Sequence, residues 1–449
     1  MAGNKGTTAV AEVAKIIDRK WVQAEAEKRQ IVKRERKFEV VTLVATLVLG
    51  FQSGAKRSLS ALHDVYNLAV GKGKQMSWGS WRPRLTTGVA SLVRDLAIRG
   101  LETLNRGRPE FTGILAKFRD VIAIDSIVIR LHDLLEKLYP ACRTNHTLAA
   151  AKIHTVLSIT GRSRTQVVLT SQRVCDQSPF RRVGPWVRGN LLLFDLGYYS
   201  FSLFSRIDRA GGMFVSRLKD NANPLIVGVN RTWRGNSVPL VGEKLQDVQQ
   251  RLTREEVDVM VEVEVPRRAY KGQSRRVTEV YRVVGVRDDI DDSYHWYITN
   301  VPLGTLSPAE IATVYAARWL VELLFRELTE HHRIKDMPSP DPAIVEILIY
   351  SSLLSLVLSR HLGVYLNRRL AAAGVQVAPE RLAGALRSVA ELILLNLVRP
   401  GQRKALPANW ITDALIRGCV SPQRNRPDLA MRVDTGTQIL HLKRALQAA

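Results

Sequence analysis

The segment DVIAIDSIVIR, Asp120–Arg130, decides the fold of this chain. Val121 to Ile124 form a short apolar run rich in β-branched residues, which predicts a buried β-strand. An acidic residue, Asp125, follows at or near the end of that strand. A carboxylate in this position can cap the next helix or take part in a functional site, so Asp125 alone leaves both interpretations open.

Four further segments downstream have the composition of strands. They are Ala151–Thr160, Thr165–Ser171, Leu191–Phe194 and Met213–Leu218. The strand expected at Leu191–Phe194 ends in a second acidic residue, Asp195, and Gly197 then allows a sharp exit into a helix. We therefore expect a sheet that carries acidic residues at the ends of two strands.

The pattern changes over residues 221–295. In VDVMVEVEV, Val257–Val265, every second residue is a valine and acidic residues lie between them. Such alternation is typical of an antiparallel strand with one solvated face. The segment RVTEVYRVVGVR, Arg276–Arg287, is its expected hairpin partner. These features predict an all-β insertion, after which YHWYITNV, Tyr294–Val301, returns to a buried strand.

A helix is expected to begin at Ser307-Pro308 and to continue into YAARWLVELLFRELTEHHRIK. On a helix, Tyr315, Arg318 and Glu322 fall on one polar stripe. Arg318 and Glu322, four residues apart, could simply form a surface pair worth about 0.3–0.5 kcal/mol. Alternatively, Glu322 is a catalytic carboxylate beside groups that bind an anion.

The charge of the chain favours a polyanionic partner. Its 449 residues include 66 Lys plus Arg and 42 Asp plus Glu, which gives a net charge of +24. This balance indicates DNA or RNA first and an anionic membrane second, although a merely cationic soluble protein is the alternative. Residues 1–110 are expected to be helical and to contain a basic loop, GKGKQMSWGSWRPR, suited to contact with a DNA backbone.

No segment predicts a signal peptide or a membrane span. The longest uncharged apolar helix candidate, Ile347–Ser359, is too short to cross a bilayer and is expected to be a core helix. The three cysteines form no CxxC pair, so neither a disulfide framework nor a zinc finger is expected. These features predict a protein of the reducing cytosol.

Taken together, the three acids predict phosphodiester chemistry. Asp125 and Asp195 at strand ends and Glu322 on a later helix match an α/β ribonuclease-H-like sheet with a helix across it. Magnesium prefers such hard oxygen ligands. Two ions about 3.5–4 Å apart can activate a water or a 3′-hydroxyl and stabilise the leaving oxygen. Acids for the metal within a basic chain suit a nuclease-type reaction on DNA.

These motifs resemble a known family. YAARWLVELLFREL, Tyr315–Leu328, resembles the Y-x2-R-x3-E-x6-K signature of insertion-sequence DDE transposases of the IS-four type. VIAIDSI and LLLFDLGYYS are similar to that family's first and second aspartate motifs, and His331–Arg360 resembles the segment that commonly follows the signature. A β-rich insertion between the second aspartate and the glutamate is also a family trait. The resemblance covers roughly residues 115–365.

The resemblance implies roles for particular residues. Asp125, Asp195 and Glu322 would be the catalytic residues and the ligands of two Mg²⁺ ions, for which Mn²⁺ can substitute. Tyr315 and Arg318 would hold DNA phosphate near the cleavage site, a task that suits the bidentate fork of arginine.

The resemblance also implies DNA contacts at Trp296 and at the position of the signature's final lysine. Trp296 occupies the strand before the helix, where related transposases keep an aromatic residue that stacks on a flipped base; an ordinary core aromatic is the alternative. The final lysine of the signature falls on Thr329, which can donate a hydrogen bond to phosphate but brings no charge. Arg326 is better placed than Lys335 to supply that charge.

The implied function is a DNA transposase that cleaves and joins strands at the ends of an insertion sequence, by cut and paste through a hairpin intermediate. Its partners would be double-stranded DNA, as terminal inverted repeats and target, and a second copy of the chain when two ends are synapsed. It would act in the prokaryotic cytoplasm at the nucleoid and not at a membrane. The alternatives are a ribonuclease-H-like nuclease without transposition and a catalytically inactive DNA-binding derivative.

The expected domain organisation follows from these motifs. It comprises a basic helical N-terminal region (1–112), the first part of the catalytic domain (113–220), the β insertion (221–295), the second part of the catalytic domain (296–365) and a helical C-terminal region (366–449).

Overall fold

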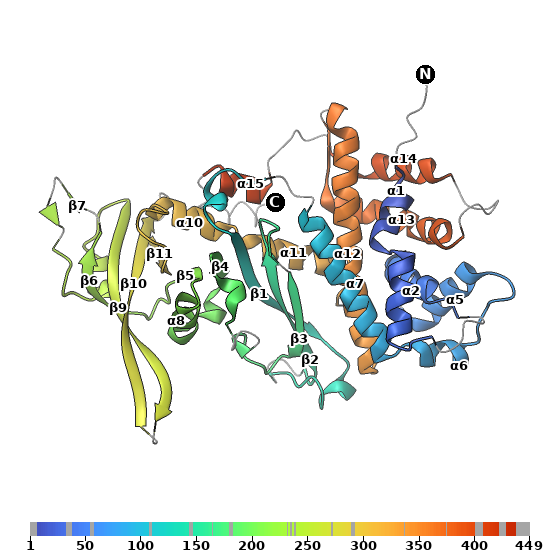
Figure 1. Ribbon diagram of the computed structural model, residues 1–449, viewed down its shortest axis with the longest axis horizontal. Coiled ribbons are helices and arrows are strands. Elements are labelled where there is room, and N and C mark those ends of the chain that lie inside the picture. The colour runs from blue at the N-terminus through green and yellow to red at the C-terminus, as the bar shows by residue number, and fades with distance from the viewer. Residues whose placement is uncertain are drawn as a thin grey trace.

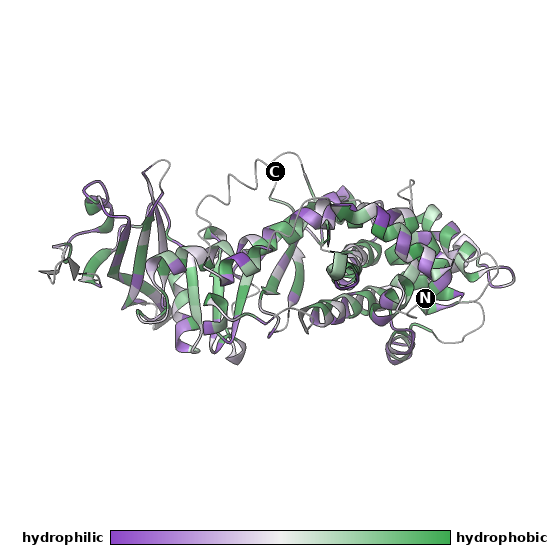
Figure 2. Cartoon of the chain, turned by 90° about the horizontal axis from the view of Figure 1, so that it is seen from above, coloured by the Kyte–Doolittle hydropathy of each residue, from purple (hydrophilic) through white to green (hydrophobic). Residues whose placement is uncertain are grey.

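The chain forms an elongated body with a β-sheet at one end and a bundle of helices at the other (Figure 1). This computed structural model describes residues 7–436 except 33–37, 54–57, 107–109, 143–146, 164, 179–182, 231, 234–235, 238, 271–272, 289–291, 336, 374, 400–406 and 422–427. Hydrophobic residues run through both ends of the body (Figure 2), so sheet and bundle each have an apolar core.

All five strands expected in the first half of the sheet are present. They are β1 (Asp120–Arg130), β2 (Ala150–Ser158), β3 (Gln166–Ser171), β4 (Asn190–Phe194) and β5 (Met213–Arg217). They belong to a nine-stranded sheet of order β3-β2-β1-β4-β5-β11-β10-β9-β6. β1, β4 and β5 are parallel, whereas β2 and β3 are antiparallel to their neighbours. The sheet is therefore mixed, with its parallel strands near the middle.

Asp125 lies within β1, and the expectation that it ends the strand is corrected. Parallel pairing with β4 stops at Ile124 and Phe194, but β1 continues to Arg130 against β2 alone. The second half of β1 remains a strand because antiparallel pairing persists and Ile129 is buried in the core. Asp125 thus follows the last residue of the parallel ladder.

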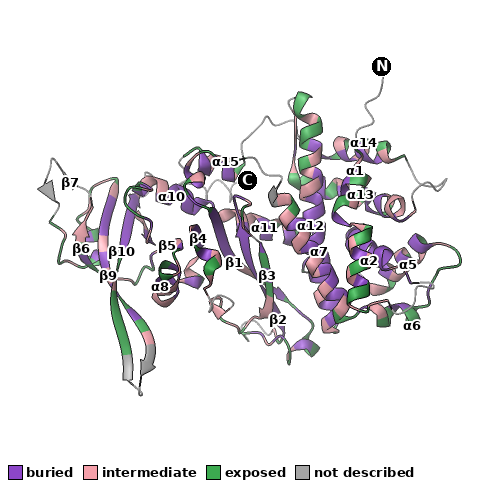
Figure 3. Cartoon of the chain, viewed as in Figure 1, coloured by how far each residue is buried: buried purple, intermediate pink, exposed green. Residues whose placement is uncertain are grey.

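The long strands of the β insertion extend the central sheet, whereas two short strands pair only with each other, and a short helix means that the insertion is not all-β as expected. β6 (Leu225–Val229), β9 (Glu256–Tyr270) and β10 (Gln273–Arg287) join the central sheet through β11 (Tyr294–Thr299), which pairs with β5. The short β7 (Thr232–Trp233), β8 (Asn236–Ser237) and α9 (Leu245–Gln249) complete the insertion. Figure 3 shows that β1 is largely buried, whereas the far part of the β9–β10 hairpin is exposed.

The alternation predicted for β9 is present with one exception. Its valines are buried and Glu264 is exposed, but Asp258 is buried as well. Asp258 is tolerated there because Arg282 on β10 binds it, with Nη2 of Arg282 2.7 Å from Oδ2 of Asp258. A buried carboxylate with its partner is far less costly than one without.

The two faces of the sheet carry different helices. Ile122, Ile124 and Phe194 face a core shared with α8 (Phe201–Arg209), whereas Val121 and Ala123 face the core of the helical end. This separation follows from the two-residue period of a strand. Asp125 lies two residues after Ala123, and Asp195 directly follows Phe194 of the opposite set. The side chains of both acids therefore belong to the face with Val121 and Ala123, which α11 covers.

The helix that carries the signature is divided in two. α10 (Pro308–Ala316) begins at a capping box between Ser307 and Glu310, and α11 (Trp319–Glu330) begins after Arg318. At the junction the N–H of Arg318 donates to the carbonyl of Tyr315, only three residues back, which tightens the turn. The expectation of one continuous helix is therefore wrong, but the three side chains still lie together: the guanidinium of Arg318 is 5.5 Å from the centre of the Tyr315 ring and 2.6 Å from Glu322.

Most of the remaining helices form the bundle around α12 (Pro342–Leu370), whereas α15 (Leu429–Asp434) packs beside α10 at the sheet end of the body (Figure 1). Before the sheet come α1 (Ala9–Ile16), α2 (Arg19–Lys28), α3 (Val40–Ala45), a π-helical turn (Thr46–Gly50), α4 (Phe51–Ser53), α5 (Leu59–Val70), α6 (Trp78–Trp81) and α7 (Thr87–Arg106). After it come α13 (Pro379–Val398), α14 (Ala408–Cys419) and α15 (Leu429–Asp434), with the short strands β12 (Gln376–Val377) and β13 (Val420–Ser421).

α12 is longer than its apolar stretch suggests. It has 29 residues because the helix continues on both sides of Ile347–Ser359. Within the described part of the chain, one helical segment, Pro342–Ala373, is long and apolar enough to cross a membrane, and 83% of its most apolar window is buried inside the protein. That burial is the property of the core helix expected from the sequence.

Candidate active site

Two acids lie side by side at the centre of the sheet. Asp125 and Asp195 each follow the last pair of the parallel β1–β4 ladder, Ile124 with Phe194. Neighbouring strands lie about 4.8 Å apart, so the register alone brings the two acids together. α11 packs against β1 on the same face and carries Glu322 in its first turn. The structure therefore gathers the three acids expected from the sequence into one region.

Arg318 links the acids from its position before α11. Its Nη1 lies 2.6 Å from Oε1 of Glu322 and 3.6 Å from Oδ2 of Asp125, and the residue is 5% exposed. Burial by itself lowers the pKa of the guanidinium, but Tyr315, Glu322 and Asp195 more than offset this and raise it above its ordinary value. The guanidinium is thus a permanent cation among the carboxylates.

Asp125 is the acid whose titration is most altered. Burial raises the pKa of its carboxyl from 3.8 to about 6, and the charges of Asp195 and Glu322 act in the same direction. The N–H of Ser126, which donates to Oδ1 at 2.7 Å, and the nearby Arg318 oppose that rise. A crowded, partly buried carboxylate of this kind is stabilised either by taking up a proton or by a cation beside it.

The raised pKa of Asp125 predicts how the stability of the metal-free protein depends on pH. The folded state keeps a proton that the unfolded chain has released, so this contribution to stability is complete below pH about 4 and is lost as the pH rises through about 6. Urea unfolding of the wild type and of Asp125→Asn between pH 4 and 7.5 measures it. The wild type should lose stability relative to the variant as the pH rises; parallel curves would contradict the assignment.

Tyr315 supports the site from within. Its hydroxyl donates to the carbonyl of Phe194, 3.2 Å away, and its ring packs on Tyr297 with centroids 5.1 Å apart. The residue is 5% exposed. Tyr315 therefore holds the end of β4 directly before Asp195, and the contact with DNA phosphate implied by the resemblance remains a prediction.

Trp296 lies on the other face of the sheet. Along β11, Tyr297 packs in the core that contains Tyr315, whereas Trp296 packs against the core that contains α8. Its ring stacks on Tyr294, and a Cβ at Gly285 would come within 2.6 Å of it, so only glycine fits opposite. The structure does not bring Trp296 together with the acids; its stacking on a flipped base remains a prediction.

The other two positions expected to contact DNA lie on α11. Arg326 is exposed, one turn beyond Glu322. Thr329 is partly buried, and its hydroxyl donates to the carbonyl of Arg326 at 2.9 Å, within the same helix. Arg326 is accordingly more accessible than Thr329, and the contact of either residue with a phosphate remains a prediction.

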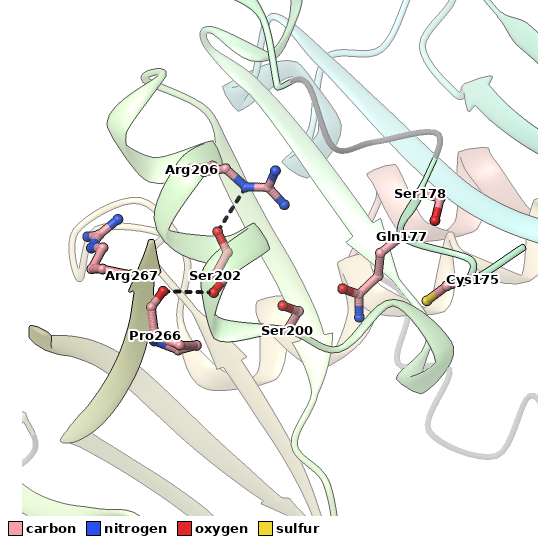
Figure 4. A pocket seen from close by; sticks show the side chains of 8 residues that line it. All are labelled: Cys175, Gln177, Ser178, Ser200, Ser202, Arg206, Pro266 and Arg267. Atoms are coloured by element: carbon pink, nitrogen blue, oxygen red, sulfur yellow. Dashed lines mark hydrogen bonds between the residues drawn. The ribbon is translucent and has the colours of Figure 1, made fainter. Parts of the chain in front are cut away.

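A cavity of about 580 Å³ lies between the chain after β3 and the start of α8 (Figure 4). Hydroxyl groups and two arginines dominate its lining, and none of the lining residues that the structure describes is acidic. The lining residues are Cys175, Gln177, Ser178, Ser200, Ser202, Arg206, Pro266 and Arg267. Because Cys175 and Gln177 flank Asp176, whose Oδ2 lies near Gly197, the cavity adjoins the region of Asp195.

Sequence reasoning missed a second layer of polar residues beside the acids. Ser126, Lys152 and Asp176 are hydrogen-bonded or ion-paired to one another there. Lys152 could have been identified from the sequence, since it is a charged residue within an otherwise apolar predicted strand. Asp176 carried none, because its segment has no strand or helix pattern.

The donor set suits a hard divalent cation. Carboxylate oxygens are the ligands that Mg²⁺ and Mn²⁺ accept, and the guanidinium of Arg318 shows that a cation fits between Asp125 and Glu322. Among the residues that the structure describes, no group of three His, Cys, Asp or Glu side chains is drawn together tightly enough to hold a metal ion.

Comparison with known proteins gives one family and several similar chains. The family described as Transposase DDE domain matches residues 116–358. The transposase for insertion sequence element IS231F of Bacillus thuringiensis subsp. israelensis is 19% identical over 380 residues, which cover 78% of each chain. The putative transposase y4zB of Sinorhizobium fredii is 25% identical over 237 residues, 52% of this chain and 59% of that protein.

Among solved structures, the piggyBac transposase synaptic complex with hairpin DNA is similar with a TM-score of 0.39 and 10% sequence identity. The similarity covers 94% of this chain and 88% of that chain.

Proposed function

Because this chain belongs to the insertion-sequence DDE transposases, enzymes that act on DNA, we propose that Asp125, Asp195 and Glu322 are the acids with which it cuts and joins DNA strands. One observation carries the proposal. Two acids leave adjacent parallel strands at the same register, and Arg318 joins the first of them to the acid on α11. The test is Mg²⁺-dependent cleavage of a plasmid that carries the DNA flanking the coding region.

The topology supports a ribonuclease-H-like core. The order β3-β2-β1-β4-β5, with β2 antiparallel to β1 and with β4 and β5 parallel to it, is the arrangement expected of that fold. α11 lies against β1, as the helix that carries the third acid would. Within the proposed domains, residues 113–220 and 296–365 supply this core, and residues 221–295 extend its sheet.

We propose that the three acids hold two Mg²⁺ ions, for which Mn²⁺ substitutes. Bound divalent ions of this kind activate an attacking water or 3′-hydroxyl and stabilise the leaving oxygen of a phosphodiester. The chain itself presents the carboxylates in one region, keeps Asp125 partly shielded from solvent and holds a cation, Arg318, beside them. With cations at the acids, the guanidinium of Arg318 would be available to bind the phosphate that is cut.

The positive charge of the chain supports DNA as the partner in this reaction. A net charge of +24 favours a polyanion, and Arg326 is exposed one turn from Glu322. We propose that the cavity beside Asp195 receives the phosphate backbone of one strand, with Arg206 as its principal cation. The helical region 1–112 would bind the terminal inverted repeats, and the exposed Trp78 beside its basic loop suits that task.

Replacing Arg206 with Gln should weaken DNA binding and reduce the slope of log K against log salt concentration by about one, since one phosphate contact is lost. Arg209→Gln is the matched control, because Arg209 lies on the same helix, is more exposed and pairs with Glu279 outside the cavity lining. Filter binding or fluorescence anisotropy at salt concentrations from about 50 to about 300 mM measures the DNA affinity of both variants and gives the two slopes. Equal slopes for the two variants would remove the cavity from the DNA path.

The finer steps are also proposals. We propose cut and paste through a hairpin intermediate, carried out by a homodimer that synapses two transposon ends in the prokaryotic cytoplasm. A ribonuclease-H-like nuclease without transposition would share the metal chemistry, and terminal inverted repeats around the coding region distinguish the two. An inactive DNA-binding derivative is the third possibility, which cleavage by the wild type would exclude.

A further inference from the structure

A buried lysine lies beside the acids on the neighbouring strand. Every residue of β2 is buried, including Lys152, which is 8% exposed. Its Nζ lies 2.9 Å from Oδ1 of Asp176 and donates to the carbonyl of Val174 at 3.0 Å. Because a buried ammonium is costly without a partner, this ion pair has to persist for β2 to keep Lys152 inside.

The carboxylate of Asp176 lies close to residues that follow Asp125 and Asp195 in the sequence. Its Oδ1 accepts a hydrogen bond from the hydroxyl of Ser126 at 3.0 Å, and the N–H of Ser126 in turn donates to Asp125. Its Oδ2 lies beside Gly197, where a Cβ would be 3.4 Å away. One carboxylate is therefore hydrogen-bonded to the residue after Asp125 and lies near the second residue after Asp195.

Lys152 is the cation that balances this layer. The other basic side chain there, His154, has its pKa lowered to about 4 by burial and is neutral at pH 7. His154 contacts Thr170 and the hydroxyl of Tyr198, and burial raises the pKa of Tyr198 so that its hydroxyl stays protonated. The carboxylate of Asp176 is thus matched by the ammonium of Lys152.

We propose that Lys152 and Asp176 form a positioning pair that fixes Asp125 and Asp195 in the arrangement needed to bind a divalent cation. Asp176 acts through Ser126 and through the backbone at Gly197, and its charge is already neutralised by Lys152, so it is not itself a metal ligand. Partners of this kind behind metal ligands orient them and tune affinity. The inference rests on the proposed function, because it assumes that the three acids bind metal.

The experiment measures Mn²⁺ binding to the DNA-free protein by electron paramagnetic resonance, and strand cleavage separately. Lys152→Met and Asp176→Asn should each raise the half-saturating Mn²⁺ concentration about 10–100-fold. At a fixed subsaturating Mn²⁺ concentration kcat should fall by a similar factor, KM for DNA should stay unchanged, and excess Mn²⁺ should restore most of the rate. Lys152→Arg, which keeps the charge, should bind Mn²⁺ more tightly than Lys152→Met.

Lys117→Met is the matched control, since Lys117 pairs with Glu310 at 2.9 Å and touches none of the three acids. It should leave Mn²⁺ binding unchanged. Ser126→Ala breaks the link without removing a charge and carries the test if a charge variant does not fold; it should shift Mn²⁺ binding in the same direction.

Two results would overturn the positioning role. One is unchanged Mn²⁺ affinity in folded Asp176→Asn and Ser126→Ala. The other is a loss of binding in Asp176→Asn that equals that of Asp125→Asn and resists excess Mn²⁺, which would make Asp176 a ligand. If the wild type binds no Mn²⁺ and cleaves no DNA, the proposed function fails instead.

Discussion

Asp125→Asn, Asp195→Asn and Glu322→Gln should each reduce Mg²⁺-dependent strand cleavage by more than about 10³-fold, a larger loss than partners behind metal ligands produce. Each substitution keeps the shape of the side chain and removes one charged oxygen donor. The three acids act as a unit around the cation, so the loss of any one should be nearly as severe as the loss of all three. Cleavage of a plasmid that carries the flanking DNA, followed on denaturing gels, measures the rates.

Binding of DNA distinguishes a catalytic defect from a folding defect. All three variants should bind DNA at least as well as the wild type, because each removes a negative charge from a surface that meets phosphate. Glu330→Gln is the matched control: Glu330 is exposed at the end of the same helix and should be dispensable for cleavage. Cleavage by the three variants at the wild-type rate would show that the acids are wrongly assigned.

Local patterns in the sequence predicted most of the elements that carry the site. The β-branched run at Val121–Ile124 and the alternating valines of β9 gave the strands, because strand faces repeat every two residues. Ser307-Pro308 marked the start of α10 because proline suits the first position of a helix, and the structure adds a capping box between Ser307 and Glu310. The contact between Arg318 and Glu322 followed from their spacing on a helix.

Contacts that depend on strand order could not be predicted in this way. Arg318 also meets Asp125, and Tyr315 bonds the carbonyl of Phe194, because β1 and β4 are neighbours beneath the signature helices. Hydrophobic period fixes which face a residue occupies but not which strand lies beside it. For the same reason, the sequence could not predict that the β insertion joins the central sheet through β11.

The inward direction of Arg318 changes what this arginine is expected to do. The resemblance assigns it to DNA phosphate, whereas in the protein alone it neutralises two of the acids. Both roles suit a guanidinium, which presents several donors on one plane. A cation that pairs with the acids before metal binds, and with phosphate afterwards, would keep the site balanced throughout.

Arg318→Met should therefore destabilise the metal-free protein by about 3–5 kcal/mol at pH 7.5, the loss typical of a broken buried ion pair. The substitution leaves two partly buried carboxylates, Asp125 and Glu322, facing each other without the buried guanidinium that now lies between them. Lowering the pH through about 6 should shrink the loss, because Asp125 takes up a proton and the repulsion falls. Saturating Mg²⁺ should shrink it as well, since a divalent cation supplies the missing charge. Urea unfolding at pH 5 and 7.5, with and without Mg²⁺, measures each difference.

Arg326→Met is the control, because Arg326 is exposed on the same helix and its replacement should change stability by no more than about 0.5 kcal/mol. Arg318→Lys should recover only part of the stability, since a single ammonium cannot present the planar fork that reaches both acids. A loss in Arg318→Met that is independent of both pH and Mg²⁺ would come from packing alone. In that case Arg318 would not be the cation that holds the acids together before metal binds.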